Sequence, residues 1–184
     1  MFYLKGLKIM ANVIVNNIQI SFDPDQTKVA QEIFDSFHSL DDQFASADLS
    51  TLYENPENTR GWWEENIGAK WARIQDMSLD PGEMMINIES AWTHVDPFVH
   101  RLMEMFNNQC TIRHEWVDEW PTEFGYRVYD HGVFSDEEEF VYTEEEIHEE
   151  YNKAHKTTGE PTQDEMWDWV WDWCYSKITE PAEQ

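Results

Sequence analysis

The chain has few basic residues and little glycine, and both shortages exclude classes of function. Only 12 Lys and Arg residues oppose 38 Asp and Glu residues, which gives a net charge of −26 at pH 7. Nucleic acid and anionic membranes would both be repelled by such a protein, so direct binding to either is excluded. With only 7 glycines, the chain contains no glycine-rich phosphate loop and no GxSxG nucleophile motif.

Cysteines and long apolar runs are scarce as well. The two cysteines, Cys110 and Cys174, lie far apart and form no metal-binding spacing, so they are expected to be reduced and buried. No apolar run approaches the length of a membrane span. Residues 1–9 lack a small-residue cleavage site and are interpreted as a leader ahead of the folded part, not as a signal peptide. These features predict a protein of the host cell cytoplasm.

The histidines do not form a metal-binding pattern. Neither the pair His94 and His100 nor the pair His148 and His155 has a third ligand on one helical face, and HExxH is absent. No catalytic residue, metal or cofactor is therefore predicted. A small hydrolase or metal-dependent enzyme that uses carboxylates and His near Trp62 stays open as the alternative to a binding protein.

The first part of the chain alternates strand and helix patterns. Ile18, Ile20 and Phe22 recur at the period of a half-buried strand, and Asp23-Pro24 with Gln26 predicts a capped helix start. The apolar positions of that helix are Val29, Ile33, Phe34, Phe37 and Leu40.

Residues 45–70 show no sustained period and are predicted to be a long loop. The loop contains the adjacent Trp62 and Trp63. Two interpretations stay open: these side chains cover an open edge of the core, which is favoured, or they bind a partner.

A hairpin, a helix and two strands follow the loop. The hairpin turns at Asp80-Pro81-Gly82, and Asp96-Pro97 repeats the helix-start signal. Alternation at 110–116 and 124–128 predicts two further strands. The order β-α-β-β-α-β with one more strand predicts an α+β, ferredoxin-like domain over residues 10–134, with two helices on one face of an antiparallel sheet.

Residues 135–184 differ in composition, with 16 acids against 3 bases and therefore half of the net charge. Two capping boxes, Thr143 with Glu146 and Thr162 with Glu165, predict two helices. In the second helix, Val170, Cys174 and their neighbours share one face, and Asp164, Asp168 and Asp172 form a stripe on the opposite face. We expect an acidic helical extension packed on the domain.

Several residue clusters within residues 10–134 resemble the YubB-like ferredoxin-like domain of plasmid and bacteriophage proteins. The segment Asn66-Ile67-Gly68-Ala69-Lys70-Trp71 is similar to the family's Asn-Trp-Gly-Thr-Lys-Trp motif, although Ile67 replaces a Trp and Ala69 a Thr. Residues 90–97 lie where the family has Thr-Ala-Trp-Ser-Pro-Pro. The start at Met10-Ala11-Asn12 and the pair Phe124-Gly125 also fit. The resemblance implies a ferredoxin-like fold and a mobile-element origin, and no catalytic assignment.

Together these features predict a non-enzymatic accessory protein that binds, and inhibits, a basic host protein such as a nuclease or another defence factor. Carboxylates four residues apart on a helix are separated by about 6 Å, a spacing of the same order as that of successive phosphates, so mimicry of DNA is one form of this hypothesis. The alternative is that the acids form a solvated helix face that serves only solubility. Self-association into a homodimer is also left open. The candidate partner-binding residues are Asp136, Glu137, Glu138, Glu139, Glu144, Glu145, Glu149, Asp164, Asp168, Asp172, Trp62 and Trp63.

Overall fold

The computed structural model describes residues 12–38, 47–54, 56–156 and 162–179, so the predicted leader and Leu40 lie outside the described residues. Seven strands form one sheet in the order β2-β3-β4-β1-β5-β6-β7, and all neighbouring pairs are antiparallel. The strands are β1 (Val13–Phe22), β2 (Ala47–Asp48), β3 (Ala72–Asp80), β4 (Glu83–Ala91), β5 (Cys110–Asp118), β6 (Glu123–Asp130) and β7 (Val133–Val141).

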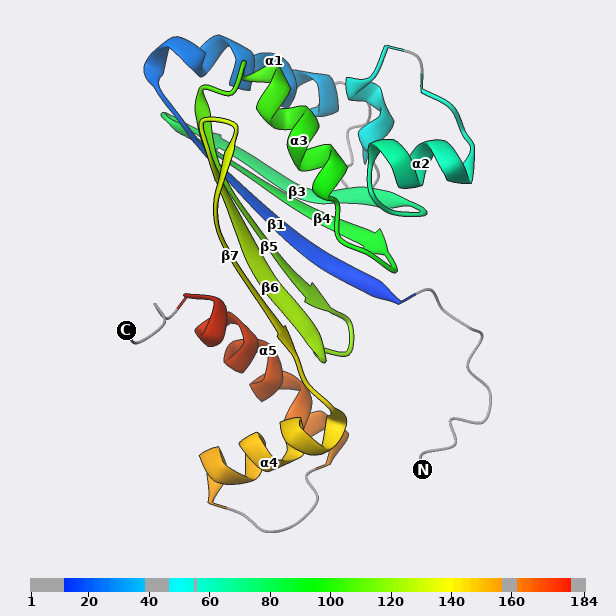
Figure 1. The fold of residues 1–184 in the computed structure, drawn as a ribbon, viewed down its shortest axis with the longest axis vertical. Coiled ribbons are helices and arrows are strands. Elements are labelled where there is room, and N and C mark those ends of the chain that lie inside the picture. The colour runs from blue at the N-terminus through cyan, green and yellow to red at the C-terminus, as the bar shows by residue number, and fades with distance from the viewer. Residues whose placement is uncertain (1–11, 39–46, 55, 157–161, 180–184) are drawn as a thin grey trace.

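The helices gather at the two ends of this sheet (Figure 1). The helices that precede β5 in the chain lie near one end, and those that follow β7 lie at the other end. None of the helices in the described ranges is both long and apolar enough to cross a membrane. The α-helices are α1 (Thr27–His38), α2 (Arg60–Asn66), α3 (Asp96–Met105), α4 (Glu144–His155) and α5 (Gln163–Thr179), and two short 3-10 turns are η1 (Pro24–Gln26) and η3 (Leu49–Leu52).

The centre of the sheet has the ferredoxin-like order. Within β3-β4-β1-β5, strand β1 pairs with both β4 and β5, and α1 and α3 connect strands that are not neighbours. The predicted α+β class and ferredoxin-like arrangement are confirmed. The sheet is extended beyond this unit by β2 at one edge and by β6 and β7 at the other.

Side-chain alternation divides the sheet into two faces. Ile18 lies beside Ile86 of β4 and His114 of β5, so these side chains share a face. Helices α1 and α3 cover that face and bury a large apolar cluster, which we call the first core. Its largest members include Ile18, Ile20, Ile33, Met84, Ile86, Phe98, Leu102, Phe106 and Ile112.

The opposite face carries a smaller apolar cluster, the second core, beneath α4 and α5. Tyr175 on α5 accepts a hydrogen bond from Asn17 Nδ2 (3.0 Å), and the Ile178 carbonyl accepts one from Arg113 Nη2 (2.8 Å). Asn17 and Arg113 both point away from the first core, so α5 lies on the other face. The second core consists of Val117, Phe124, Ile147, Val170, Cys174 and Ile178.

At both Asp-Pro helix starts, the cap in the structure differs from the cap predicted from the sequence. Asp23 makes no side-chain cap, and α1 begins through η1 instead. Gln26 is buried, and its Nε2 donates to Gln109 Oε1 at 2.6 Å, so it does not complete a capping box. In α3 the cap position is held by Val95, and Asp96 is the first helical residue. Its carboxylate is therefore free to contact side chains of the sheet.

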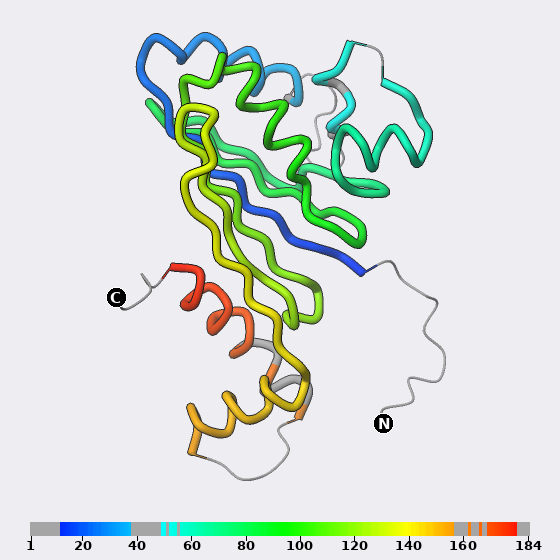
Figure 2. The backbone as a smooth tube through the Cα atoms, in the orientation of Figure 1, coloured from blue at the N-terminus to red at the C-terminus, as the bar shows by residue number. Residues whose placement is uncertain are grey.

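Two boundaries predicted from sequence are wrong. The predicted loop 45–70 contains β2, η3 and α2, and Thr59 caps α2 by accepting from the Trp62 backbone N–H at 3.3 Å. The predicted start of the helical extension at Ser135 falls inside β7. The helices of the extension begin only at Glu144, after the chain has completed a seventh strand (Figure 2).

Candidate partner-binding surface and a buried polar network

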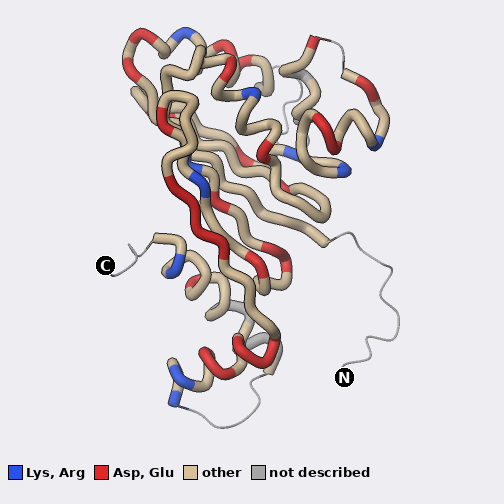
Figure 3. The backbone as a smooth tube through the Cα atoms, viewed as in Figure 1, with Lys and Arg blue, Asp and Glu red and all other residues tan. Residues whose placement is uncertain are grey.

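An acidic surface of the described chain follows β7. Figure 3 shows acidic residues along this strand and again at the start of α4. Asp136, Glu137 and Glu139 are exposed, and Glu138 is half-buried. The sequence analysis assigned these four residues to a helical extension, whereas they lie on the outermost strand of the sheet.

The four carboxylates of β7 point to both faces of the sheet. Glu137 and Glu139 pair with Arg127 and Gly125 on the face of the first core, whereas Asp136 and Glu138 point to the other face. Glu137 Oε2 lies 3.0 Å from Arg127 Nε, and Asp136 Oδ2 accepts from the Tyr126 hydroxyl at 3.1 Å. The edge therefore presents negative charge on both sides.

Helix α4 continues the acidic surface. Its predicted capping box is confirmed: Glu146 N–H donates to Thr143 Oγ1 (3.2 Å), and Thr143 N–H donates to Glu146 Oε2 (2.7 Å). The Thr143 N–H and the Thr143 hydroxyl (2.9 Å) both donate to the Glu146 carboxylate and lower its pKa. Ile147 and Tyr151 are buried, and Glu144, Glu145 and Glu149 are exposed on the outer side.

Helix α5 has the predicted buried face, since Val170, Cys174 and Ile178 are buried and Asp172 is exposed. The side chains of Asp164 and Asp168 lie outside the described part of the structure, so the predicted acidic stripe is placed only at Asp172. Burial raises the pKa of Cys174 to about 12 and that of Cys110 to about 11. Both cysteines are free, buried thiols.

The tryptophan pair of α2 lies far from the acidic surface (Figure 1). Trp62 and Trp63 are half-buried and pack against the first core. Trp62 also makes an edge contact with Tyr53, with ring centroids 5.1 Å apart. These contacts support the interpretation that the pair covers the core.

A buried polar network connects the centre of the sheet with its acidic edge. Asp96 Oδ1 lies 3.1 Å from His114 Nδ1, and Asp96 Oδ2 forms an ion pair with Arg127 Nη1. His114 Nε2 lies 3.1 Å from Asn16 Oδ1, and this oxygen accepts a hydrogen bond from the Val95 backbone N–H at 3.2 Å. Arg127 joins this network to β7, because the same guanidinium contacts Glu137.

Burial disfavours the protonated form of His114 and of the neighbouring His94. Burial, followed by the nearby His94, lowers the pKa of His114 to about 3. Burial, followed by Arg127, also lowers the pKa of His94. A neutral ring has one N–H, and we assign that of His114 to Nδ1, because the Asp96 carboxylate is a stronger acceptor than the Asn16 amide oxygen.

The network is suited to holding structure. His114 is completely buried, and its second nitrogen faces an amide oxygen, with no hydroxyl or thiol in the position of a nucleophile. His94 Nδ1 lies 3.2 Å from Asp96 Oδ1 but is not aligned for a hydrogen bond. Among the described residues, no group of three His, Cys, Asp or Glu side chains has a geometry that would hold a metal ion.

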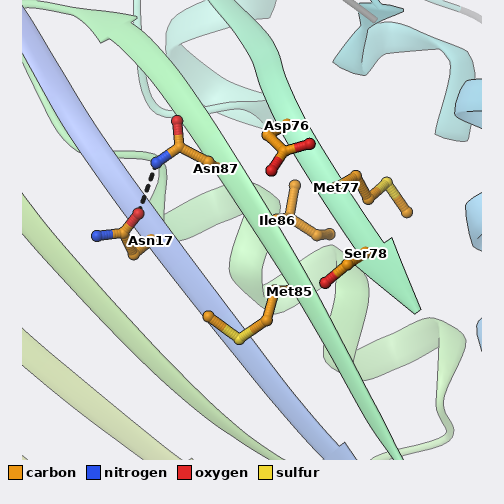
Figure 4. A pocket seen from close by; sticks show the side chains of 7 residues that line it. All are labelled: Asn17, Asp76, Met77, Ser78, Met85, Ile86 and Asn87. Carbon is orange, nitrogen blue, oxygen red and sulfur yellow. Dashed lines mark hydrogen bonds between the residues drawn. The ribbon is translucent and has the colours of Figure 1, made fainter. Parts of the chain in front are cut away.

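A shallow hollow lies on the open face of β1, β3 and β4 (Figure 4). Asn87 Nδ2 donates to Asn17 Oδ1 at 2.6 Å across its floor, and Asp76 is the only carboxylate among the described residues that line it. A single carboxylate beside two amides, a serine and two methionines does not form an acid–base pair. The hollow therefore offers no reactive constellation.

Sequence reasoning missed the network, although the sequence contained a signal for it. Asn16 and His114 occupy inward positions of strands whose adjacent inward residues are apolar, such as Ile18 and Ile112. A polar residue at such a position needs an internal partner. Asn16 and His114 are 98 residues apart in the sequence. The periodicity of a single strand does not show that two such distant residues lie side by side.

Comparison with known proteins places the chain in a family. Residues 66–168, more than half of the chain, match the family described as "Ferredoxin-like domain in Api92-like protein". Among solved structures, the chain is similar to the protein Api92 from Yersinia pseudotuberculosis, with 18% sequence identity and a TM-score of 0.38 over 50% of this chain and 33% of that chain. A search of curated proteins finds no match. The resemblance noted in the sequence is thus confirmed at the level of a ferredoxin-like domain, and the chain belongs to the family of Api92-like proteins that contain this domain.

Proposed function

We propose that this protein acts by binding a basic protein partner through the acidic surface of β7 and α4. One observation supports the proposal above others: the carboxylates of β7 and the outer carboxylates of α4 lie at the surface, while Phe140 of β7 and Ile147 of α4 pack in the second core. Such a surface raises the rate of encounter with a positively charged partner and repels anionic ones.

The kind of partner follows from the charge. A protein that carries a large basic surface most often uses it to bind nucleic acid. Carboxylates two residues apart on β7 are separated by about 6.6 Å. This is close to the distance of about 6 Å between carboxylates four residues apart on a helix, which is of the same order as the spacing of successive phosphates. The partner class we propose is a nucleic-acid-binding host protein, such as a nuclease or another defence factor, whose binding surface is occupied and inhibited. The resemblance to mobile-element proteins fits this role.

The alternative of a small hydrolase or metal-dependent enzyme near Trp62 has no specific observation in its favour. The charged residues of α2 are Arg60, Glu64 and Glu65. Arg60 and Glu64 pair with each other at 2.6 Å, and Glu65 is exposed. The buried His114 and Asp96 lie in the network described above, on other elements.

The proposal is tested by capturing partners from a bacterial lysate with three forms of the full chain. The surface variant neutralises six acids: Asp136→Asn, Glu138→Gln, Glu139→Gln, Glu144→Gln, Glu145→Gln and Glu149→Gln. The control variant neutralises exposed acids elsewhere: Asp23→Asn, Asp25→Asn, Glu54→Gln, Glu57→Gln, Glu65→Gln and Asp80→Asn. Both variants keep the shapes of the side chains and have the same net charge.

The wild type and the control variant should retain a basic protein at low salt, release it at high salt, and release it when duplex DNA is added. The surface variant should retain little of it. Equal retention by all three forms, or no retention of a basic protein at any salt concentration, would contradict the proposal.

A further inference from the structure

Strand β7 leaves one edge of the sheet open. It pairs with β6 along its length, and no other strand in the described ranges pairs with it. The backbone N–H and C=O groups along the outer side of such a strand have no partner within the sheet. At nine residues, β7 is as long as the inner strands β3 and β4.

The side chains of β7 form an uncommon pattern for an open edge. Apolar residues at its two ends are strongly exposed: Val133 by 66%, Phe134 by 50% and Val141 by 69%. Between them lie the four acids 136–139. An exposed edge with apolar ends favours pairing with another strand, whereas its acidic centre restricts which strand can pair.

The acidic centre disfavours a second copy of this chain. Two β7 strands that pair antiparallel about their centres would place residues 136–139 of one copy opposite the same acids of the other, and like charges directly opposite each other are destabilising. Opposite charges in the same positions are stabilising. The edge is therefore complementary to a strand with a basic centre and apolar ends.

We propose that β7 accepts an extended basic segment of the partner as an eighth strand of the sheet. Main-chain hydrogen bonds to the outer edge of β7 supply affinity, and Lys or Arg side chains opposite 136–139 supply specificity. Glu137 already pairs with Arg127, so Asp136, Glu138 and Glu139 are the principal carboxylates for the incoming cations. This inference rests on the proposed function and specifies how the acidic surface recognises its partner.

Three synthetic peptides of equal charge test the mode of binding to the full-length protein. The first is a β-forming peptide as long as β7, with a lysine centre and ends rich in valine and threonine. The second has the same sequence with alternate backbone nitrogens methylated, which removes hydrogen-bond donors from one edge. The third is a lysine–alanine peptide that forms a helix. Affinity is measured by titration, and contact is located by backbone hydrogen exchange.

The β-forming peptide should bind at least about tenfold more tightly than either control, a difference of about 1.4 kcal/mol, and should slow exchange of amides in Val133–Val141. The triple variant Asp136→Asn, Glu138→Gln, Glu139→Gln should lose this binding. Its matched variant on α4, Glu144→Gln, Glu145→Gln, Glu149→Gln, should largely keep it.

Equal binding of all three peptides, or protection confined to α4, would overturn strand addition and leave charge-based binding intact. Failure of all three peptides to bind would also overturn strand addition. The proposed function would then be judged separately by the lysate capture, which does not depend on the conformation of the bound segment.

Discussion

The two faces of the sheet are stabilised in different ways. The first core is built mainly from fully buried aliphatic side chains and phenylalanines of α1, α3 and the central strands. The second core has six fully buried side chains, and much of the rest is half-buried aromatic surface such as Trp169, Trp173 and Tyr142. Aromatic rings also stack there, with Trp169 and Trp173 centroids 5.4 Å apart.

This difference separates the stability of the fold from its proposed function. Burial of apolar area is the main stabilising term in folding, so the first core holds the domain together. The second core packs α4 and α5 against β5, β6 and β7. We therefore expect mutations in the two cores to have different consequences.

The largest effect is expected for Phe98→Ala in the first core. Phe98 is completely buried, and its truncation should lower the free energy of unfolding by about 4 kcal/mol, as measured by urea denaturation. Ile178→Ala in the second core should cost about 2 kcal/mol. Its main result should be faster hydrogen exchange in α5, with exchange in β1 and β4 unchanged. Equal acceleration in all of these elements would show that the two cores open as one unit.

The next largest effect is expected at Arg127, which contacts Asp96 of the buried network and Glu137 of the acidic strand β7. Arg127→Met leaves the Asp96 carboxylate, whose side chain is 18% exposed, without its cation. Loss of one member of a largely buried ion pair should lower the free energy of unfolding by about 3 kcal/mol. Arg60→Met breaks the exposed pair with Glu64 and should cost about 0.5 kcal/mol or less. Similar losses for both variants would mean that the network adds no stability.

A smaller effect is expected from acidification. The pKa values of His94 and His114 are lowered in the folded protein, so the unfolded chain takes up these protons first. Their contribution is therefore complete above the unfolded pKa of about 6.5 and is lost as the pH falls toward the folded values, about 3 for His114. Each histidine adds a slope of at most about 1.4 kcal/mol per pH unit. Denaturation between pH 7 and 5 should show a smaller slope for His114→Gln than for the wild type, and identical slopes would contradict the assignment.

The smallest effect is expected at the start of α4. Thr143→Ala removes the side chain that caps the helix and should cost about 1 kcal/mol, seen as faster exchange in the first turn of α4. Thr143→Ser keeps the capping oxygen and should behave like the wild type. A uniform change over the whole chain would show that α4 does not open on its own.

Much of the first core, and the start of α4, could be predicted from the sequence, because the sequence signals for them are local. The alternation of Ile18, Ile20 and Phe22 and the apolar stripe of Phe98, Val99 and Leu102 each follow from the repeat of a strand or a helix. The capping box of Thr143 and Glu146 lies within one helical turn. Such patterns are fixed by backbone geometry and need no knowledge of distant partners.

The acidic edge could not be predicted in the same way. Alternation identifies a strand only when one face is buried, and β7 has acids on both faces because it lies at the edge in solvent. Helix α2 was missed because it is short and has no fully buried residue. The network of Asn16, Asp96, His114 and Arg127 is assembled from four separate elements of the fold, so no local pattern describes it.

The most direct test of the account is hydrogen exchange of the full chain with and without the basic protein that it captures. We predict slower exchange in β7 and α4 upon binding, with exchange in α1, α2 and α3 unchanged. Protection on α1–α3 with none on β7 or α4 would contradict the claim that the acidic surface binds the partner.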